Sequence, residues 1–235
     1  MKRNNTNLKF QESSILYEDN HLIIVNKPCG VLVQGDITGD IPLLEIIKTY
    51  IKEKYDKRGN VYLGLVNRID RPTSGIVIFA KTSKALSRMN EKLKNREIRK
   101  TYWLIISNKF DSKQGKLDGW FKKNTKRNKS FFYNKEQKDS KYGSLTYKKI
   151  QNFEKYCMIE VDLITGRHHQ IRCTFSELGF PILGDLKYGS KRSNKDGGIY
   201  LHSRELSFIH PVSKKNINVK ANTPMNGLWS ASPSC

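Results

Sequence analysis

The stretch VNRIDRPTSGIVIFAK, residues 66–81, places a carboxylate between two arginines and then turns into an apolar run. Asp70 lies between Arg68 and Arg71, and residues 72–75 (PTSG) form a turn signal before the apolar residues. In an exposed surface turn these charges would simply be solvated. In a working site the two guanidiniums would favour the ionised carboxylate, and the turn would present it at the mouth of a sheet. The local sequence leaves both interpretations open.

The chain is strongly basic, and this charge restricts the class of partner. Its 235 residues include 43 Lys and Arg against 22 Asp and Glu, a formal net charge of +21. Such a field attracts polyanions, either nucleic acid or an anionic membrane. No stretch approaches the roughly 18 apolar residues of a membrane span, so we expect no membrane partner. Residues 1–14 lack the apolar core of a signal peptide, and the four cysteines form no C-x-x-C pair. We therefore expect a cytoplasmic protein without a disulfide framework or a zinc site.

Short apolar runs and helical spacings are mixed irregularly along the chain. Helical spacing predicts helices over 41–55 and 83–95. Strands are predicted at 22–26, 31–33, 61–65, 76–80, 99–106, 142–150, 156–163, 199–208 and 216–220. Because strands and helices do not alternate as strict βαβ units, the predicted fold class is α+β. The last dozen residues are expected to be frayed.

A long polar stretch at 113–141 concentrates the positive charge. It contains ten Lys and Arg against three acidic residues, about +7, with five aromatic residues interleaved. One interpretation is a solvated hairpin in a lysine-rich chain. The other is a projecting hairpin that clamps RNA, with aromatics available for stacking and with phosphate contacts from Lys122, Lys123, Lys126 and Arg127. No hydrophobic face runs along the stretch, which argues against a lipid-inserting helix.

The segment DLITGRHHQIRCTFSELGFPILGDLKYG, residues 162–189, is a second dense cluster of polar chemistry. We expect Thr165 to cap a helix over about 167–178. His168 and Arg172 are then four residues apart near the positive end of the helix dipole, which suits a phosphate or a carboxylate of the protein itself. For Arg172 two interpretations stay open: a surface cation, or the partner of a buried charge.

Together the two segments resemble the pseudouridine synthase superfamily, in its RluA-type branch, which isomerises uridines in ribosomal and transfer RNA. Residues 66–81 are similar to its H-R-L-D-R-x-T-S-G-L-L-x-x-A-K signature, whose catalytic aspartate falls on Asp70. RKTYWLII (99–106) resembles its K-x-Y segment, so the active-site tyrosine falls on Tyr102. TGRHHQIR (165–172) resembles T-G-R-x-H-Q-I-R, so the active-site arginine falls on Arg172. HLIIVNKPCGVLV, GFPILGDLKYG and LHSRELSFIHP complete a match that spans residues 15–220.

The resemblance implies one catalytic domain over residues 15–222, built on a mixed, largely antiparallel sheet with flanking helices and a central active-site cleft. The hairpin at 113–141 is an insertion in this domain, and residues 1–14 and 223–235 are tails. The small N-terminal RNA-binding domain of many relatives is expected to be missing. Neither a cofactor nor a metal is implied, and RNA is the expected partner of a monomer. Asn67 replaces the family's usual histidine.

The resemblance also implies roles for the site residues. Asp70 acts as an ionised carboxylate, either as a nucleophile or by abstracting a sugar proton, and Arg172 pairs with it. Tyr102 stacks on the flipped uracil and assists proton removal from C5, while Arg68 fills the vacated base stack. The remaining substrate-binding residues are Ile69 and Leu201, as apolar walls, together with Arg71, Arg167, His168 and Gln170.

Two other classes of function remain as alternatives. One is an RNA-binding or ribosome-assembly factor that has lost catalysis, with Asn67 as its only support. The other is a metal-dependent nuclease that uses Asp70 and His168. Adjacent histidines cannot share a helix face, and no further acidic ligand lies at a metal-site spacing, so ordinary polar packing of His168 and His169 is favoured over metal binding.

Overall fold

The computed structural model describes residues 12–233 of the chain. The helices are α1 (Leu43–Lys54), α2 (Ser83–Lys94) and α3 (Gln170–Glu177). The strands are β1 (Ile15–Glu18), β2 (Leu22–Lys27), β3 (Gly64–Leu65), β4 (Ser74–Ala80), β5 (Arg99–Ser107), β6 (Gln114–Asn124), β7 (Lys129–Tyr133), β8 (Lys141–Asn152), β9 (Tyr156–Leu163), β10 (Leu201–Ile209) and β11 (Asn216–Lys220). Most of the expected tail at 1–14 therefore lies outside the described residues.

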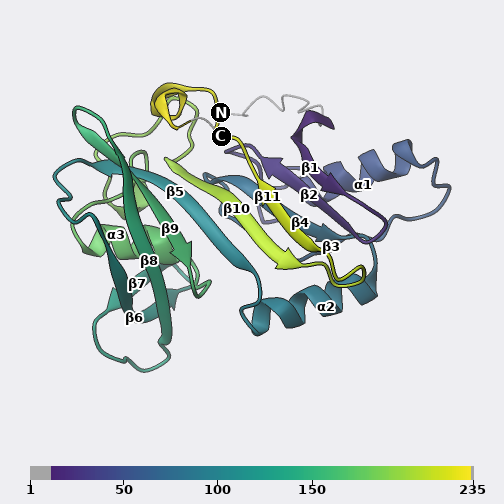
Figure 1. The fold of residues 1–235 in the computed structure, drawn as a ribbon, viewed down its shortest axis with the longest axis horizontal. Coiled ribbons are helices and arrows are strands. Elements are labelled where there is room, and N and C mark those ends of the chain that lie inside the picture. Colours follow the sequence, from purple (N-terminus) through teal and green to yellow (C-terminus); the bar gives the residue numbers. More distant parts are fainter. Residues whose placement is uncertain (1–11, 234–235) are drawn as a thin grey trace.

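The strands form one long, twisted sheet with two wings (Figure 1). Within the described residues it has 11 strands, in the order β1-β2-β4-β10-β5-β9-β8-β6-β7, with β3 on β4 and β11 on β10. Every pair is antiparallel except β4 with β10. The predicted α+β class with a largely antiparallel sheet is confirmed. No helix in the described part of the chain is both long and apolar enough to cross a membrane.

Strands β2 and β4 form the buried centre of one wing. Alternate side chains enter two core clusters: one holds Ile23, Val25, Val77 and Phe79, and the other holds Leu22, Ile24, Ile76 and Ile78. Helix α1 contributes Leu43, Ile47 and Ile51 to the first cluster, whereas α2 contributes Ala85 and Met89 to the second. Because both faces are covered, these strands appear in the sequence as unbroken apolar runs.

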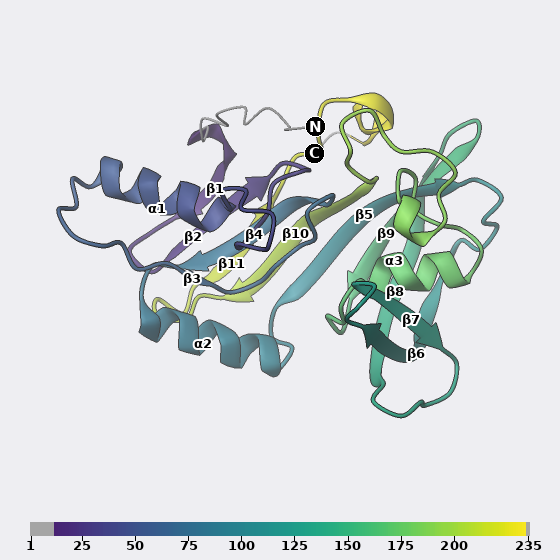
Figure 2. The ribbon, with the colours of Figure 1, turned by 180° about the vertical axis from the view of Figure 1, so that it is seen from behind.

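The other wing consists of β9, β8, β6 and β7, with α3 packed against it (Figure 2). The β6–β7 hairpin lies along α3, and its Phe121 and Phe132 form a small cluster with Cys173 and Tyr188. The expectation that the aromatics of the basic stretch are available for stacking on RNA is wrong for these two residues. Their rings fasten the hairpin to the domain, so the hairpin does not project freely.

The two wings meet where β4 runs beside β10. Ser74 pairs there with His202, and Gly75 pairs with Ser203. Gly75 has φ +111°, and a Cβ at this position would lie 2.3 Å from the carbonyl oxygen of Ser203. Glycine is therefore required for this close approach. This close approach of β4 and β10 joins the two wings just beyond the turn that carries Asp70.

Two predicted strands are corrected. Residues 31–33 form no strand, because their backbone serves the start of α1 instead: the amides of Leu43 and Leu44 donate to the carbonyls of Leu32 and Val33 at 2.7 and 3.2 Å. Pro42 gives no side-chain cap to this helix, so these carbonyls satisfy its first donors. The strand expected at 61–65 is limited to Gly64–Leu65.

Three further predictions are also wrong, two at the start of α3 and one near the C-terminus. The helix expected over 167–178 begins at Gln170, because His169 has the left-handed φ of +53° and the chain cannot be helical before it. Thr165 caps no helix; its hydroxyl donates to Gln170 Oε1 at 2.8 Å. The final residues are not frayed throughout, since a 3-10 turn at Gly227–Ala231 buries Trp229 against Trp103 and Met158.

Candidate active site

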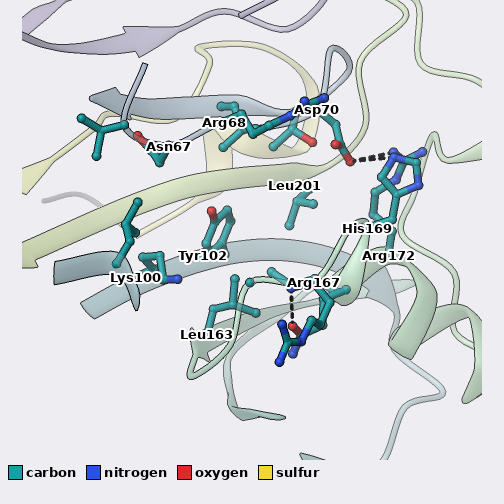
Figure 3. A pocket seen from close by; sticks show the side chains of 17 residues that line it. Asn67, Arg68, Asp70, Lys100, Tyr102, Leu163, Arg167, His169, Arg172 and Leu201 are labelled. Atoms are coloured by element: carbon teal, nitrogen blue, oxygen red, sulfur yellow. Dashed lines mark hydrogen bonds and ion pairs between the residues drawn. The ribbon is translucent and has the colours of Figure 1, made fainter. Parts of the chain in front are cut away.

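A cavity of about 270 Å³ lies at the junction of the two wings (Figure 3). Asp70 and Arg68 line it from the β3–β4 connection, and Tyr102 lines it from β5. The structure brings eight of the ten predicted catalytic and substrate-binding residues to this cavity: Arg68, Ile69, Asp70, Tyr102, Arg167, Gln170, Arg172 and Leu201. The other two, Arg71 and His168, line a second cavity of about 600 Å³ that also contains Asp70.

The turn that carries Asp70 is held in place by hydrogen bonds from the end of β2 and the residues that follow it. The Thr73 amide donates to the Asp70 carbonyl at 3.0 Å, and the Gly30 amide donates to the Arg71 carbonyl at 2.8 Å. Lys27 is fully buried, and its Nζ donates to the carbonyls of Pro28, Val31 and Arg71 at 2.9, 2.9 and 3.2 Å. Burial lowers the pKa of Lys27 to about 7. A buried amine thus fixes the backbone beside Asp70.

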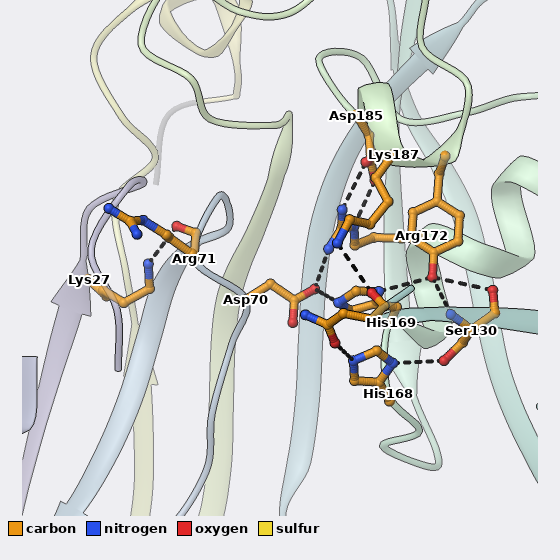
Figure 4. A network of polar contacts seen from close by, with 11 residues as sticks. Lys27, Asp70, Arg71, Ser130, His168, His169, Arg172, Asp185 and Lys187 are labelled. Carbon is orange, nitrogen blue, oxygen red and sulfur yellow. Dashed lines mark hydrogen bonds and ion pairs between the residues drawn. The ribbon is translucent and has the colours of Figure 1, made fainter. Parts of the chain in front are cut away.

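Arg172, on α3, is the cation that Asp70 contacts. Its Nη1 lies 2.8 Å from Asp70 Oδ2, while its Nε and Nη2 donate to Asp185 at 2.7 and 2.8 Å. Burial would lower the pKa of Arg172, but the bonds to Asp185 and Asp70 raise it. The guanidinium is therefore a permanent buried charge, fixed from one side by Asp185 and presented to Asp70 on the other (Figure 4).

The pKa of Asp70 is lowered, although burial alone would raise it, because the nearby His169 and Arg172 favour the charged form, and of these two Arg172 is the one that carries a full charge at neutral pH. The expectation that Arg68 and Arg71 supply this stabilisation is wrong. Arg71 donates to Asp40 at 2.6 Å and to the Gly30 carbonyl at 2.9 Å, and Arg68 is exposed. The carboxylate is nevertheless ionised at neutral pH, as predicted.

The two adjacent histidines lie between Asp70 and the β6–β7 hairpin (Figure 4). Their rings stack with centroids 3.8 Å apart, and His169 Nε2 is 3.4 Å from Asp70 Oδ2. Burial lowers the pKa of His169 to about 3, so this imidazole is neutral at physiological pH. His168 contacts Ser130 Oγ at 2.8 Å and Asn128 Oδ1 at 3.2 Å. Both rings are thus partnered by protein groups, and the described residues contain no cluster of three metal-ligating side chains.

Tyr102 gives the cavity an aromatic wall. It is 7% exposed, and burial together with the charge of Asp70 raises its pKa to about 12. Leu201 on β10 and Ile69 add apolar surface beside it, as predicted for pocket walls. A flat apolar wall that faces a carboxylate suits a planar polar ring such as a nucleobase.

Gln170 of the predicted set, and Asn67, which replaces the family's usual histidine, have their polar atoms used inside the protein. Gln170 Oε1 accepts from Thr165 Oγ1 and from the Arg167 amide at 2.8 and 2.9 Å, and its Nε2 donates to the Ser144 carbonyl at 3.1 Å. Gln170 therefore holds the loop that carries Arg167. Asn67 accepts from the Ile78 amide at 2.7 Å and donates to the Ile76 carbonyl at 3.3 Å, so it extends the pairing of β3 with β4.

Several site residues are missed by sequence reasoning. Lys100 lies two positions before Tyr102 on the same face of β5 and lines the same cavity, and burial lowers its pKa. Asp185 and Tyr188 fix Arg172 and His169, with Tyr188 Oη 2.9 Å from His169 Nδ1. Asp185 and Tyr188 lie in the GDLKYG segment, so the sequence does point to them. This segment contributes to the family resemblance, but the sequence alone assigns no role to its residues.

The predicted phosphate-binding residues lie at the tip of the β6–β7 hairpin, close to this site. Lys123, Lys126 and Arg127 are exposed, and Lys122 is half-buried. The turn of the hairpin ends at Asn128, whose carbonyl accepts from Lys187 Nζ at 3.2 Å. The basic tip is therefore continuous with the rim that contains His168 and Lys187.

The cavity combines an ionised carboxylate, an aromatic wall and a basic rim, and the comparisons with known proteins identify the family of enzymes that has this fold. Residues 21–177 match the family described as RNA pseudouridylate synthase. The chain belongs to this family, whose enzymes are isomerases that act on RNA uridine.

Individual relatives cover most of this chain. It is 34% identical over 218 residues to the ribosomal large subunit pseudouridine synthase C of Buchnera aphidicola subsp. Baizongia pistaciae, covering 88% of this chain and 66% of the relative. It is 29% identical over 213 residues to the uncharacterized RNA pseudouridine synthase YlyB of Bacillus subtilis, covering 89% and 69%. The chain thus spans about two thirds of the length of these curated relatives.

The fold is shared with solved structures as well. Human RNA Pseudouridylate Synthase Domain Containing 4 superposes with a TM-score of 0.72 at 21% identity, covering 90% of this chain and 89% of that one. At this identity the likeness concerns the fold alone. It confirms the predicted pseudouridine synthase fold.

Proposed function

We propose that this chain isomerises specific uridines of ribosomal or transfer RNA to pseudouridine, with Asp70 as the catalytic carboxylate. The observation that carries the proposal is the contact of Asp70 Oδ2 with Arg172 Nη1, 2.8 Å long, in a cavity lined by Tyr102. The contact keeps a carboxylate ionised in a partly desolvated pocket, where its charge is most effective. Ribosomal RNA as a substrate is suggested by the name of the Buchnera relative.

The reaction rearranges one nucleotide and needs no external group. The bond between uracil N1 and ribose C1′ breaks, the base turns over, and C5 joins C1′. C5 then loses its proton and N1 gains one, so atoms and electrons balance without redox change. Asp70 takes part either as a nucleophile at C1′ or as the base that removes a ribose proton.

Tyr102 is assigned to stacking on the flipped uracil. Its raised pKa keeps the hydroxyl protonated at neutral pH. If it takes the C5 proton, it has to pass its own proton on, and Asp70 is the acceptor whose charge already acts on it. Stacking and proton transfer are thus separable functions of one side chain.

RNA binding is assigned to the cavity rim and the hairpin. The target base has to leave its helix, which costs a few kcal/mol, and Arg68 is exposed at the rim, where its guanidinium can occupy the vacated stack. Arg71 and Arg167 line the cavities on either side of Asp70. The hairpin residues that contact phosphates of the RNA are Lys122, Lys123, Lys126 and Arg127. The enzyme that binds this RNA is proposed to be a monomer.

Pseudouridine mapping of total RNA, with and without this gene, tests the proposal and finds the substrate. We expect one or a few uridines to lose modification, and the purified protein to restore it on that RNA in the presence of EDTA. RNA binding without isomerisation would instead indicate the assembly-factor alternative. Cleavage that EDTA abolishes would indicate a metal-dependent nuclease.

A further inference from the structure

We propose that Tyr188 fixes the tautomer of His169, and that His169 thereby positions Asp70 so that one carboxylate oxygen is held and the other is left to react. The inference rests on the proposed function of the Asp70 site. It assigns a positioning function to two residues outside the expected catalytic set.

The observation is a chain of polar contacts from the hairpin to Asp70 (Figure 4). The Ser130 amide donates to Tyr188 Oη at 2.8 Å, and Tyr188 Oη lies 2.9 Å from His169 Nδ1. On the other side of the same ring, Nε2 lies 3.4 Å from Asp70 Oδ2. Tyr188 and the His169 side chain are both nearly inaccessible to solvent, so water cannot replace these partners.

The direction of each hydrogen bond in the chain follows from the donors available. Tyr188 Oη already accepts from the Ser130 amide, and its own proton has two acceptors: His169 Nδ1 at 2.9 Å or the Ser130 carbonyl at 3.3 Å. The shorter contact is to the histidine, so the hydroxyl donates to Nδ1. A neutral imidazole that accepts at Nδ1 carries its proton on Nε2. That N–H faces Asp70; the other tautomer would direct a lone pair at the carboxylate.

The consequence is an unequal pair of carboxylate oxygens. Arg172 Nη1 and His169 Nε2 both contact Oδ2, at 2.8 and 3.4 Å. Within the described part of the chain, Oδ1 has no hydrogen-bond partner. Because His169 is neutral, it orients the carboxylate without adding a second full charge that would weaken it as a nucleophile or base. A contact of 3.4 Å is longer than a regular hydrogen bond, and such catalytic contacts commonly tighten when substrate binds.

His168 supports the ring of His169. Its imidazole stacks on that ring at an interplanar angle of 23° and is held at both nitrogens by Ser130 Oγ and Asn128 Oδ1. His169 itself has the left-handed backbone conformation immediately before α3 and gives that helix no side-chain cap. The stack restricts rotation of the His169 ring about its side-chain bonds.

The tautomer can be measured directly in the free protein by 15N NMR with labelled histidine. Five histidines are present, and the disappearance of one signal pair in His169→Gln assigns that residue. We expect Nε2 of His169 to carry the proton in the wild-type protein, and Tyr188→Phe to remove this preference. A proton on Nδ1 in the wild-type protein, or an unchanged tautomer in Tyr188→Phe, would overturn the proposal.

A double-substitution cycle tests the effect on the reaction. We expect Tyr188→Phe to lower kcat roughly tenfold with little change in KM, because it releases the contact of His169 with the ionised Asp70, and tenfold is the size of effect expected from one hydrogen bond to a charged group. In His169→Gln the amide donates to Asp70 without help from Tyr188. Adding Tyr188→Phe to that variant should therefore lower kcat no further. Because the double variant is compared with His169→Gln, any strain that glutamine introduces at position 169 is present in both and cancels.

Tyr17→Phe is the matched control, because Tyr17 also donates one hydroxyl hydrogen bond, to Asp19 at 2.9 Å, but far from the site on β1. It should leave kcat unchanged. An equal decrease from Tyr188→Phe in both backgrounds would mean that Tyr188 acts through the general structure, which contradicts the proposal. An inactive wild-type protein would overturn the proposed function instead, whereas the NMR measurement decides the tautomer without turnover.

Discussion

Asp70 is ionised because of an arginine 102 positions away in the sequence, and not because of its two arginine neighbours. Arg172 is in turn fixed by Asp185, so the carboxylate that we propose as catalytic is the more exposed end of a largely buried Asp–Arg–Asp arrangement. Such an arrangement is costly to break, because removal of one member leaves an uncompensated charge in a desolvated place. It gives the site its fixed geometry.

Loss of the charge at position 172 should change the pH dependence of the reaction. Asp70 has a lowered pKa, so activity that needs its ionised form is lost only as the pH falls through that low value. In Arg172→Gln burial dominates, and the acid limb of the profile of kcat/KM should move above the ordinary Asp pKa of about 3.9. Arg172→Lys, which keeps a charge, should shift it less. An acid limb at the wild-type position in Arg172→Gln would contradict the pairing.

The hydroxyl and the ring of Tyr102 can be tested separately. Tyr102→Phe keeps the aromatic wall, so RNA affinity should stay within a few fold while the rate falls. Tyr102→Leu removes the ring and should also weaken binding of the substrate, measured as a higher KM. A wild-type rate for Tyr102→Phe would remove proton transfer from the account and leave stacking alone.

At the scale of elements, the end of β2 positions the Asp70 turn through one buried amine. Lys27 Nζ lies within hydrogen-bond distance of three backbone carbonyls, and burial lowers its pKa from 10.5 to about 7. Between these two pH values the unfolded chain holds a proton that the folded chain does not. The free energy of unfolding contributed by this group therefore falls as the pH decreases toward 7 and rises as the pH increases.

This linkage predicts a pH-dependent difference between the wild-type protein and Lys27→Met. Relative to the variant, the wild-type free energy of unfolding should rise by about 1 kcal/mol per pH unit from pH 7 to 9, close to the limit for one group. Urea unfolding at both pH values measures it. An unchanged difference between pH 7 and 9 would mean that Lys27 keeps its proton in the folded protein.

The basic hairpin should bind a large share of the RNA phosphates. Changing Lys122, Lys123, Lys126 and Arg127 to Gln should weaken RNA binding, and the slope of log affinity against log salt should fall by roughly 0.7–0.9 for each phosphate that the variant no longer neutralises. The rate at saturating RNA should change much less. The matched control neutralises the exposed Lys52, Lys57, Arg58 and Lys84 on the other wing. If both quadruple variants bind alike, the hairpin is only a solvated surface.

At the scale of the whole molecule, sequence reasoning succeeded where the pattern is local. The buried runs of β2 and β4 are visible in the sequence as apolar segments, and the α+β class follows from the irregular order of strands and helices. The largely antiparallel sheet was implied by the family resemblance. The family motifs single out Asp70, Tyr102 and Arg172, and in the structure these three residues line one cavity. The match to the RNA pseudouridylate synthase family over residues 21–177 agrees.

What sequence reasoning missed depends on contacts between distant residues. Asp185 and Tyr188 act on Arg172 and His169 through side-chain geometry that no spacing rule reveals. The start of α3 was misplaced because a left-handed residue at position 169 is not encoded by a glycine. Phe121 and Phe132 of the hairpin were expected to be available for stacking on RNA in one of the two interpretations, because periodicity does not tell which neighbouring element, here α3, covers them.

The central claim is that Asp70 performs the isomerisation, and release of the hydrogen at uridine C5 measures this directly. With RNA that carries tritium at C5, the wild-type protein should release label to water as pseudouridine forms, in the presence of EDTA. Asp70→Asn is nearly isosteric but uncharged, so it should bind the same RNA within a few fold and release no label. Measurable release by Asp70→Asn, at any rate above that of RNA alone, would contradict the account.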